Sequence, residues 1–387
     1  MRILSVCSNF RLFGAETITL KLLEGFELNG HEQLVVASCF SDGEFSRRLL
    51  SIGVREVQIP LGVFAVPKSL RAFHWTAHTL WLLPRVWLAW SRLLREFNPD
   101  VVVFTSSRQC MFLYPWLRRK PVFLIEYTNV VPSRANRILY HLLAPRLSSF
   151  IAVSDFMRAH LRRIGAPSEK VHVVKSGTFF KRERGATEQV VTSFSKHGNE
   201  PFRIGFVGQI APNKGHDCLV EAVGLLNKRG IRLSVQIFGS GDPQYVSELK
   251  TKIAEAKLTG VWNWKGYERD KAKIFGCMDV CVVPSCFGDP FPTVAMEAGV
   301  YGLPVVASRI GGLPEIIEEG ATGILVEPNV PEQLAAAIER LVQDPIRARA
   351  MGAAGRARVF QHFTVETMVK NFESLFAKSL GSCQGDE

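Results

Sequence analysis

Two carboxylates eight residues apart, Asp289 and Glu297, are the strongest chemical signal in the sequence. They lie in the Gly- and Pro-rich stretch PSCFGDPFPTVAMEAG at 284–299, where we expect a strand to end at Pro284 and a helix to begin near Thr293. Carboxylates placed in this way can accept hydrogen bonds from sugar and ribose hydroxyls, and the free N–H groups of the helix start can bind an anion. The alternative is a capping Asp and a buried structural Glu.

Two further loops have the composition of phosphate-binding turns. In FVGQIAPNKG, at 206–215, Lys214 stands just before a helix, where its ammonium can neutralise a diphosphate. In SNFRLFGAE, at 8–16, Gly14 lets the backbone approach a ligand at a helix start. Neither loop is specific by itself: taken alone, a surface lysine is the more common explanation of the first, and an ordinary strand–helix turn is the alternative for the second.

Short apolar runs alternate with amphipathic stretches and predict the elements that position these loops. Alternation of this kind favours parallel strands covered by helices on both faces. The expected strands are 3–6, 34–37, 101–104, 122–125, 150–153, 202–207, 233–238, 280–283, 305–307 and 324–326. A helix is expected over 15–29, and 331–380 is expected to be mostly helical.

The pattern predicts an α/β protein with two doubly wound, Rossmann-like domains and a ligand cleft between them. The first domain is 1–180, and the polar segment 181–200 is the linker. The second domain is 201–365. Residues 366–387 are expected to form a helix that packs back on the first domain, followed by a tail.

The chain has 387 residues, of which 47% are hydrophobic and 21% charged, so wholesale disorder is excluded. Its net charge of +11 is uneven. Residues 1–190 contain 26 Lys and Arg against 14 Asp and Glu, whereas 191–387 contain 21 against 22. The basic half should attract an anionic partner such as nucleic acid, an anionic bilayer or a phosphorylated substrate; a basic surface that only aids solubility is the alternative.

The segment 69–97 combines aromatic and basic residues and allows two interpretations. Its tryptophans and arginines are Trp75, Trp81, Trp87, Trp90, Arg71, Arg85, Arg92 and Arg95. The simpler interpretation is a helix packed on the first sheet. The other is a helix in the membrane interface, with tryptophans at headgroup depth and arginines on anionic lipid. Pro84 can kink this helix, which is too charged to span a bilayer.

The N-terminal residues lack the apolar core of a secretory signal, so we expect a cytoplasmic protein. The eight cysteines should then be reduced thiols. Cys277, Cys281 and Cys286 lack paired spacing and a nearby His, so we expect small buried side chains and no metal site.

The segment from 284 to 328, PSCFGDPFPTVAMEAGVYGLPVVASRIGGLPEIIEEGATGILVEP, resembles the C-terminal signature of the family 4 glycosyltransferases of the GT-B fold. Further segments resemble the same family, most closely in 200–330. These are FGAE (13–16), IAVSDFMRAHL (151–161), FVGQIAPNKGHDCLVEAV (206–223) and VQIFGSGD (235–242). The resemblance implies retaining transfer of a sugar from a nucleotide-sugar, with UDP-sugar favoured and GDP-sugar as the alternative, and without a required metal or other cofactor.

The resemblance also implies residue roles. Glu297 matches the second acid of the family's Glu-x7-Glu motif, expected on the donor ribose, and Asp289 stands where the first Glu is usual, expected on the sugar hydroxyls. Lys214 matches the lysine that steadies the diphosphate. The implied donor site further includes Gly14, Gln209, Gly239, Phe291, Thr293 and Val294.

Three positions depart from the family pattern. Asp289 has a shorter side chain than the usual Glu, and Gln209 replaces the usual Arg and so removes a positive charge. The family's acceptor-side His falls at Tyr127 or Glu126 in LIEYTN. A tyrosine can hydrogen-bond the donor sugar, but with a pKa near ~10 it shuttles protons poorly at pH 7.

We therefore expect a hexosyltransferase of class EC 2.4 that acts on a glycan or lipid-linked acceptor in cell-surface polysaccharide or glycolipid synthesis, peripherally at the inner face of the cytoplasmic membrane. The alternative is a catalytically weak homologue that only binds a nucleotide-sugar. Nucleic-acid binding lacks a recognisable motif. An epimerase of the same fold would need an acid–base pair that the sequence does not identify.

Overall fold

The structure of the protein is a computed structural model. The structure describes all residues except 8–13, 41–42, 61–69, 114–116, 118–119, 181–199 and 384–387, and only the backbone of 70–80 and 382–383. The predicted linker, 181–200, therefore lies almost wholly outside the described residues. The chain forms two compact units, Met1–Gly177 with Val365–Glu387 (unit 1) and Thr178–Thr364 (unit 2).

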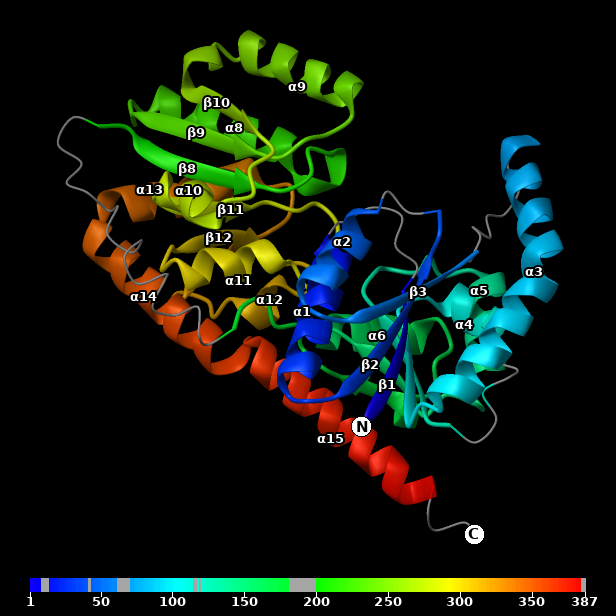
Figure 1. Cartoon of the computed structure of the whole chain (residues 1–387). Coiled ribbons are helices and arrows are strands. Elements are labelled where there is room, and N and C mark those ends of the chain that lie inside the picture. Colours follow the sequence, from blue (N-terminus) through cyan, green and yellow to red (C-terminus); the bar gives the residue numbers. More distant parts are fainter. Residues whose placement is uncertain are drawn as a thin grey trace. The chain divides into compact units, whose positions relative to one another are not determined.

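Unit 1 contains a seven-stranded parallel sheet in the order β3-β2-β1-β4-β5-β6-β7 (Figure 1). Its strands are β1 (Arg2–Cys7), β2 (Glu32–Ser38), β3 (Arg55–Ile59), β4 (Val101–Phe104), β5 (Val122–Glu126), β6 (Ser149–Ala152) and β7 (Val171–Val173). The central strands are apolar and buried, as expected for strands covered on both faces. Because β1 pairs with β2 on one side and β4 on the other, the strand order reverses beside β1.

Helices cover this sheet. They are α1 (Gly14–Leu28), α2 (Glu44–Ser51), α3 (Leu70–Phe97), α4 (Ser107–Leu113), α5 (Arg134–Leu143), α6 (Asp155–Arg163), the 3-10 helix η2 (Ser168–Lys170) and α15 (Val365–Cys383). The C-terminal helix α15 packs on α1 and β5 through aromatic rings. The ring centroid of Phe376 lies 5.8 Å from that of Phe26 on α1 and 4.7 Å from that of Phe123 on β5. A polar contact joins the same part of the unit, where Glu373 of α15 accepts a hydrogen bond from the Asn29 side-chain amide.

Unit 2 contains a six-stranded parallel sheet in the order β10-β9-β8-β11-β12-β13. Its strands are β8 (Phe202–Val207), β9 (Leu233–Phe238), β10 (Trp262–Gly266), β11 (Val280–Val283), β12 (Val305–Ser308) and β13 (Gly323–Val326). Its helices are α8 (His216–Lys228), α9 (Pro243–Glu255), α10 (Lys271–Gly276), α11 (Thr293–Val300), α12 (Leu313–Ile316), α13 (Pro331–Gln343) and α14 (Pro345–His362), with the 3-10 helices η4 (Pro212–Lys214) and η5 (Thr259–Val261). Here the order reverses between β8 and β11, which pair with each other.

The predicted pair of parallel α/β sheets is confirmed, and each expected strand is present. Three strands were missed: β3, β7 and β10. All three lie at sheet edges, where a strand has one neighbour and needs no continuous apolar run. Their polar or mixed sequences, such as REVQI in β3, therefore give a weak signal.

Helix α3 supports the packing interpretation on one face. Trp90 is fully buried, its ring lies 6.3 Å from Phe104 of β4, and its indole N–H donates to Leu113 O. Trp81, by contrast, is 66% exposed. Within the described ranges, none of the helices combines the length and apolar character that crossing a bilayer requires.

Candidate functional site

The loops after β8 and β11 meet where the strand order of unit 2 reverses. In a parallel α/β sheet this is the usual place for a ligand, because the two loops leave in opposite directions. The Cys286 N–H donates to Asn213 O at 3.0 Å and links the loops directly. Gly215 has a φ of 77°, and a side chain there would collide with the Pro284 carbonyl. The residue after Lys214 must therefore be a glycine for the loops to approach this closely.

Lys214 and Asp289 meet across this junction. The Lys214 ammonium donates a hydrogen bond of 2.7 Å to Asp289 Oδ2, and each side chain is about one quarter exposed (26% and 25%). Asp289 does not cap the following helix: the N-cap residue of α11 is Pro292, and no side chain among the described residues caps it. The interpretation of Asp289 as a helix cap is therefore wrong.

Glu297 lies in the second turn of α11 and has a cation of its own. Lys271 Nζ donates to Glu297 Oε2 at 2.7 Å, and the Glu297 side chain is 17% exposed. Lys271 is the first residue of α10, whose N-terminus is capped by Asp270. Sequence reasoning missed Lys271, because nothing in its neighbourhood marks it as a partner of a residue 26 positions away.

The other donor-site residues predicted in unit 2 line the same edge of the sheet. Thr293 and Val294 are the first two residues of α11 and are half-buried. Phe291 is buried, with its ring 5.7 Å from Phe363. Gly239 follows β9 and lies against the Gly208 carbonyl. Gln209 is exposed, and its neutral side chain brings no charge to the loop that carries Lys214.

The two residues predicted in unit 1 come after strands of its own sheet in the sequence, Gly14 after β1 and Tyr127 after β5. Gly14 is the exposed first residue of α1; the loop that precedes it, 8–13, lies outside the described residues. Tyr127 directly follows β5 and is half-buried. Burial raises the pKa of the Tyr127 phenol above its usual value, and a hydrogen bond with Thr19 opposes the rise. Tyr127 is thus a weaker proton shuttle than an ordinary tyrosine.

Glu126, the other candidate for the histidine position, faces the interior. Its carboxyl accepts a 2.5 Å hydrogen bond from the Tyr140 hydroxyl, and both residues are buried. Burial raises the pKa of Glu126 to about 7, opposed by hydrogen bonds with Tyr140 and Ser107. This acid belongs to a polar cluster between β5, α4 and α5.

The buried cysteines carry no signs of nucleophilic activation. Burial raises the pKa of Cys7 and of Cys281 to about 12, so both stay thiols at neutral pH. Partial burial likewise raises the pKa of Cys286, which lies in the Asp289 loop. Of the three cysteines expected to be buried, Cys281 is buried, whereas Cys277 and Cys286 are half-buried, because both lie in loops after the ends of α10 and β11. Among the residues that the structure describes, no three His, Cys, Asp or Glu side chains form a group that could hold a metal ion.

Comparison with known protein families decides the family. The model described as "Glycosyltransferase Family 4" matches residues 14–178, and the model described as "Glycosyl transferases group 1" matches residues 192–358. Together the two matches span most of both units. The chain belongs to the family 4 glycosyltransferases.

This glycosyltransferase is similar to several curated proteins. It is 32% identical over 230 residues to alpha-maltose-1-phosphate synthase of Mycolicibacterium smegmatis, a match that covers 55% of this chain and 59% of that protein. It is 36% identical over 159 residues to D-inositol 3-phosphate glycosyltransferase of Segniliparus rotundus, which covers 40% of this chain and 35% of that protein. The chain thus spans about a third to three fifths of the length of these relatives.

Solved structures confirm the fold of this glycosyltransferase. HepE (Alr3699) of Anabaena, in complex with UDP, aligns with a TM-score of 0.79 over 98% of this chain and 100% of that chain, at 18% identity. The same protein with UDP-glucose aligns with a TM-score of 0.77 over 99% and 100%, at 19% identity. The predicted two-domain GT-B architecture is therefore confirmed.

Proposed function

We propose that the protein transfers a sugar from a nucleotide-sugar to a glycan or lipid-linked acceptor, with retention of the anomeric configuration. The observation that carries the proposal is the junction at the switch point of unit 2, where Lys214 and Asp289 meet beside the start of α11. A cation next to an uncapped helix start suits a pyrophosphate. Asp289, in the loop before α11, supplies an acceptor for sugar hydroxyls. Glu297, in the second turn of that helix, supplies an acceptor for ribose hydroxyls.

The donor in this proposal is a UDP-sugar, because the structures of Anabaena HepE are described with UDP and UDP-glucose. A GDP-sugar is the second candidate. No metal or other cofactor enters the proposal: Lys214 and the N–H groups of α11 supply positive charge to the leaving diphosphate. Stabilising the charge that develops there is the main electrostatic contribution to such a reaction.

The proposed reaction is a displacement on one face of the sugar. The bond from the anomeric carbon to the phosphate oxygen breaks through an oxocarbenium-like state, and the acceptor oxygen bonds to the same carbon. The acceptor proton goes to the departing phosphate oxygen, so no protein nucleophile is needed. The protonated Cys281 and Cys286 agree with a reaction that uses none.

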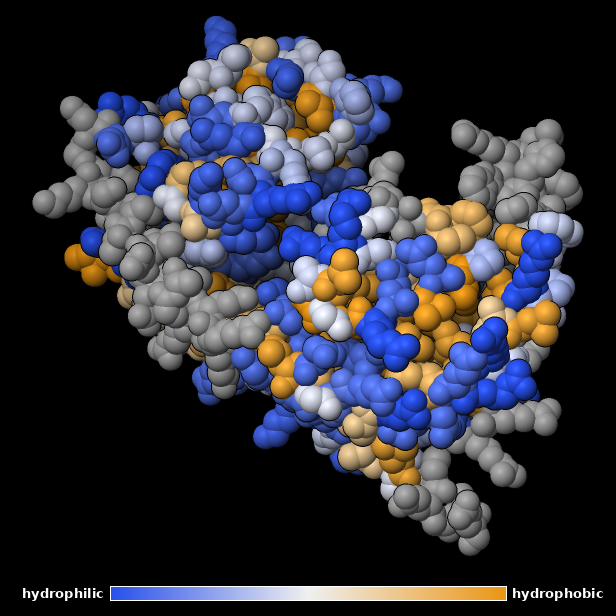
Figure 2. Space-filling model, viewed as in Figure 1, coloured by the Kyte–Doolittle hydropathy of each residue, from blue (hydrophilic) through white to orange (hydrophobic). Residues whose placement is uncertain are grey.

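The acceptor side of the proposal rests on exposed apolar side chains of two helices of unit 1, α3 and α5. Trp81 and Leu88 on α3 are 66% and 72% exposed, and Ile138 and Leu142 on α5 are 61% and 59% exposed. Exposed arginines lie on the same two helices, and Arg85 stacks over Trp81. Figure 2 shows apolar surface interleaved with strongly hydrophilic surface over α3. An amphipathic, basic surface suits an anionic membrane that presents a lipid-linked acceptor.

A catalytically weak homologue is the second candidate, and the exposed neutral Gln209 favours it, because one cation fewer stabilises the leaving group. The two candidates separate in one experiment. UDP-, GDP- and ADP-sugars are first screened by thermal shift, since a ligand at 100 times its Kd adds about 2.7 kcal/mol of stability. The best donor is then incubated with a panel of glycan and lipid-linked acceptors, and the product anomer is read by NMR.

A product with the donor's anomeric configuration supports the proposal. Donor binding without transfer across the panel supports the weak homologue, and a product of inverted configuration contradicts retention. The matched variants are Lys214→Met and Glu297→Gln, each expected to lower transfer by at least about 100-fold, because each removes a group that we place on the donor. Full activity in either variant would refute the site.

A further inference from the structure

The loop that follows β12 lies directly against the loop that carries Asp289. The Gly312 N–H donates to the Asp289 carbonyl at 2.9 Å. Gly311 has a φ of 63°, and a side chain there would collide with the backbone N and O of Asp289. Only a glycine allows this conformation and this approach. The backbone position of Asp289 is thus set from one side by residues 311–312.

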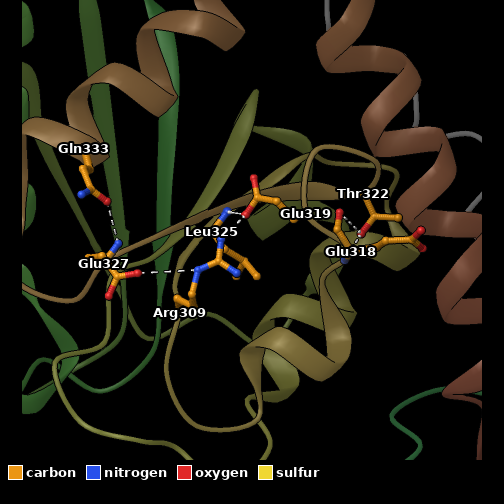
Figure 3. Close-up of polar contacts among 7 residues, drawn as sticks. All are labelled: Arg309, Glu318, Glu319, Thr322, Leu325, Glu327 and Gln333. Carbon is orange, nitrogen blue, oxygen red and sulfur yellow. Dashed lines mark hydrogen bonds and ion pairs between the residues drawn. The ribbon is translucent and has the colours of Figure 1, made fainter.

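Arg309 ties this loop to the next strand (Figure 3). Its Nη2 donates to Glu319 Oε2 at 2.8 Å, and its Nε lies 3.7 Å from Glu327 Oε1. Its backbone N–H donates to Val326 O at 2.7 Å. The guanidinium therefore bridges two carboxylates that flank β13, one before the strand and one after it.

The Glu319 carboxylate and the backbone of Glu327 are held in place by other contacts. Glu319 Oε2 also accepts from the Leu325 N–H at 2.9 Å, which fixes it to β13 itself. The Glu327 N–H donates to Gln333 Oε1 at 2.9 Å, which fixes the backbone of Glu327 to α13. Arg309 thus pairs with one carboxylate before β13 and one after it. A network of this kind fixes the loop after β12 more firmly than a single exposed ion pair would.

We propose that Arg309 is a positioning residue for Asp289: its two ion pairs fix the loop whose glycines fix the Asp289 backbone. This inference rests on the proposed function, in which Asp289 binds the sugar of the donor. Arg309 acts on the ligand through Asp289, which binds the sugar in the proposed function and also holds Lys214. It therefore raises the affinity for a sugar nucleotide relative to the bare nucleoside diphosphate.

The test compares Arg309→Met with the unsubstituted protein by calorimetric titration with UDP and UDP-glucose, or with the matching pair from the donor screen. We expect the ratio of the UDP-glucose affinity to the UDP affinity to fall by about 3- to 10-fold, the loss of two half-exposed ion pairs, while UDP binding does not weaken, because a displaced Asp289 competes less for Lys214. Arg229→Met is the matched control, because Arg229, at the end of α8, also pairs with a glutamate of unit 2, Glu339 of α13.

An equal loss for both ligands, or an unchanged ratio, overturns the role of Arg309. A double-mutant cycle with Asp289→Asn adds a second criterion: if Arg309 acts through Asp289, then Arg309→Met changes the ratio no further in the Asp289→Asn background, and additive effects overturn the inference. Absence of nucleotide binding by the unsubstituted protein would overturn the proposed function as well, and so is distinguishable from failure of the role of Arg309 alone.

Discussion

Lys214 and Asp289 reach each other from the two sides of the point at which the strand order of unit 2 reverses, with Nζ and Oδ2 2.7 Å apart. In the proposed function, the first binds the diphosphate and the second binds the sugar. The same ammonium cannot be neutralised fully by both a carboxylate and a pyrophosphate. Asp289 therefore competes with the diphosphate of a bare nucleotide for Lys214. When a sugar is attached, Asp289 binds the sugar and so contributes to the affinity for the ligand.

The first prediction concerns Asp289→Asn. Removing the negative charge frees Lys214, so we expect UDP to bind about 3- to 10-fold more tightly, the effect of one partly exposed ion pair. UDP-glucose should gain less or bind more weakly, because its sugar loses an acceptor. Calorimetric titration with both ligands measures the two effects. Glu339→Gln, which also breaks a Lys/Arg–carboxylate pair of unit 2, should change neither. Weaker UDP binding by Asp289→Asn would contradict competition for Lys214.

The second prediction concerns Lys271, which holds Glu297 Oε2. In Lys271→Met, the Glu297 carboxylate loses this cation and with it the orientation toward the ribose. We expect the preference for UDP over 2′-deoxy-UDP to fall by about 3- to 10-fold, and Lys271→Arg to retain most of it. Direct competition titrations give the two Kd values.

Lys273→Met is the control for Lys271→Met, because Lys273 lies on the same helix and its side chain is 71% exposed. An unchanged preference in Lys271→Met, or an equal fall in Lys273→Met, would show that Lys271 does not orient Glu297.

Much of the unit 2 site could be predicted from the sequence, and the reason is local. Asp289, Thr293 and Glu297 lie within nine residues, so one strand–loop–helix connection brings them together. Lys214 could be placed beside them because parallel strands bring their carboxyl ends to one edge. The pairing of Lys214 with Asp289 needed the strand order, which no local pattern contains.

Lys271 and Arg309 could not be predicted for the same physical reason. Their partners come from other elements, and the ion pairs depend on how α10 packs beside α11 and how β12 pairs with β13. The repeated glycine at 311–312 is the one local sign of a close backbone approach, and sequence reasoning did not use it. Asp289 also has a helix-capping interpretation, which is excluded because Pro292 is the N-cap residue of α11.

The third prediction uses the buried carboxyl of Glu126. Its pKa is raised from 4.5 to about 7 by burial, so the folded protein holds the proton more tightly than the unfolded chain. The contribution of Glu126 to the free energy of unfolding is therefore greatest below pH 4.5. This contribution falls by about 3 kcal/mol in all as the pH rises from 4.5 to above 7. Glu126→Gln stays neutral, and its amide oxygen can still accept from Tyr140.

We expect Glu126→Gln to be more stable than the unsubstituted protein at pH 8 and close to it at pH 5. Calorimetric melting at the two pH values measures this difference. Glu169→Gln, at an exposed position, is the control and should show no such dependence. An equal effect of Glu126→Gln at both pH values would mean that the carboxyl is ionised to the same extent in the folded and unfolded states.

The last prediction tests the exposed apolar side chains of α3. If these side chains enter the headgroup region of a membrane, the double variant Trp81→Ser, Leu88→Ser should be recovered several-fold less with floating vesicles that contain anionic lipid. The reason is that burial of one large apolar side chain contributes about 1.5–3 kcal/mol. Leu28→Ser is the matched control, since Leu28 is 56% exposed on α1 of the same unit. Vesicles of zwitterionic lipid should recover little of either protein, and added salt should weaken binding to anionic ones, because the arginines of this surface are exposed to screening. Equal recovery of the double variant and the control would show that α3 makes no such contact, and binding that salt does not weaken would exclude the arginines as its cause.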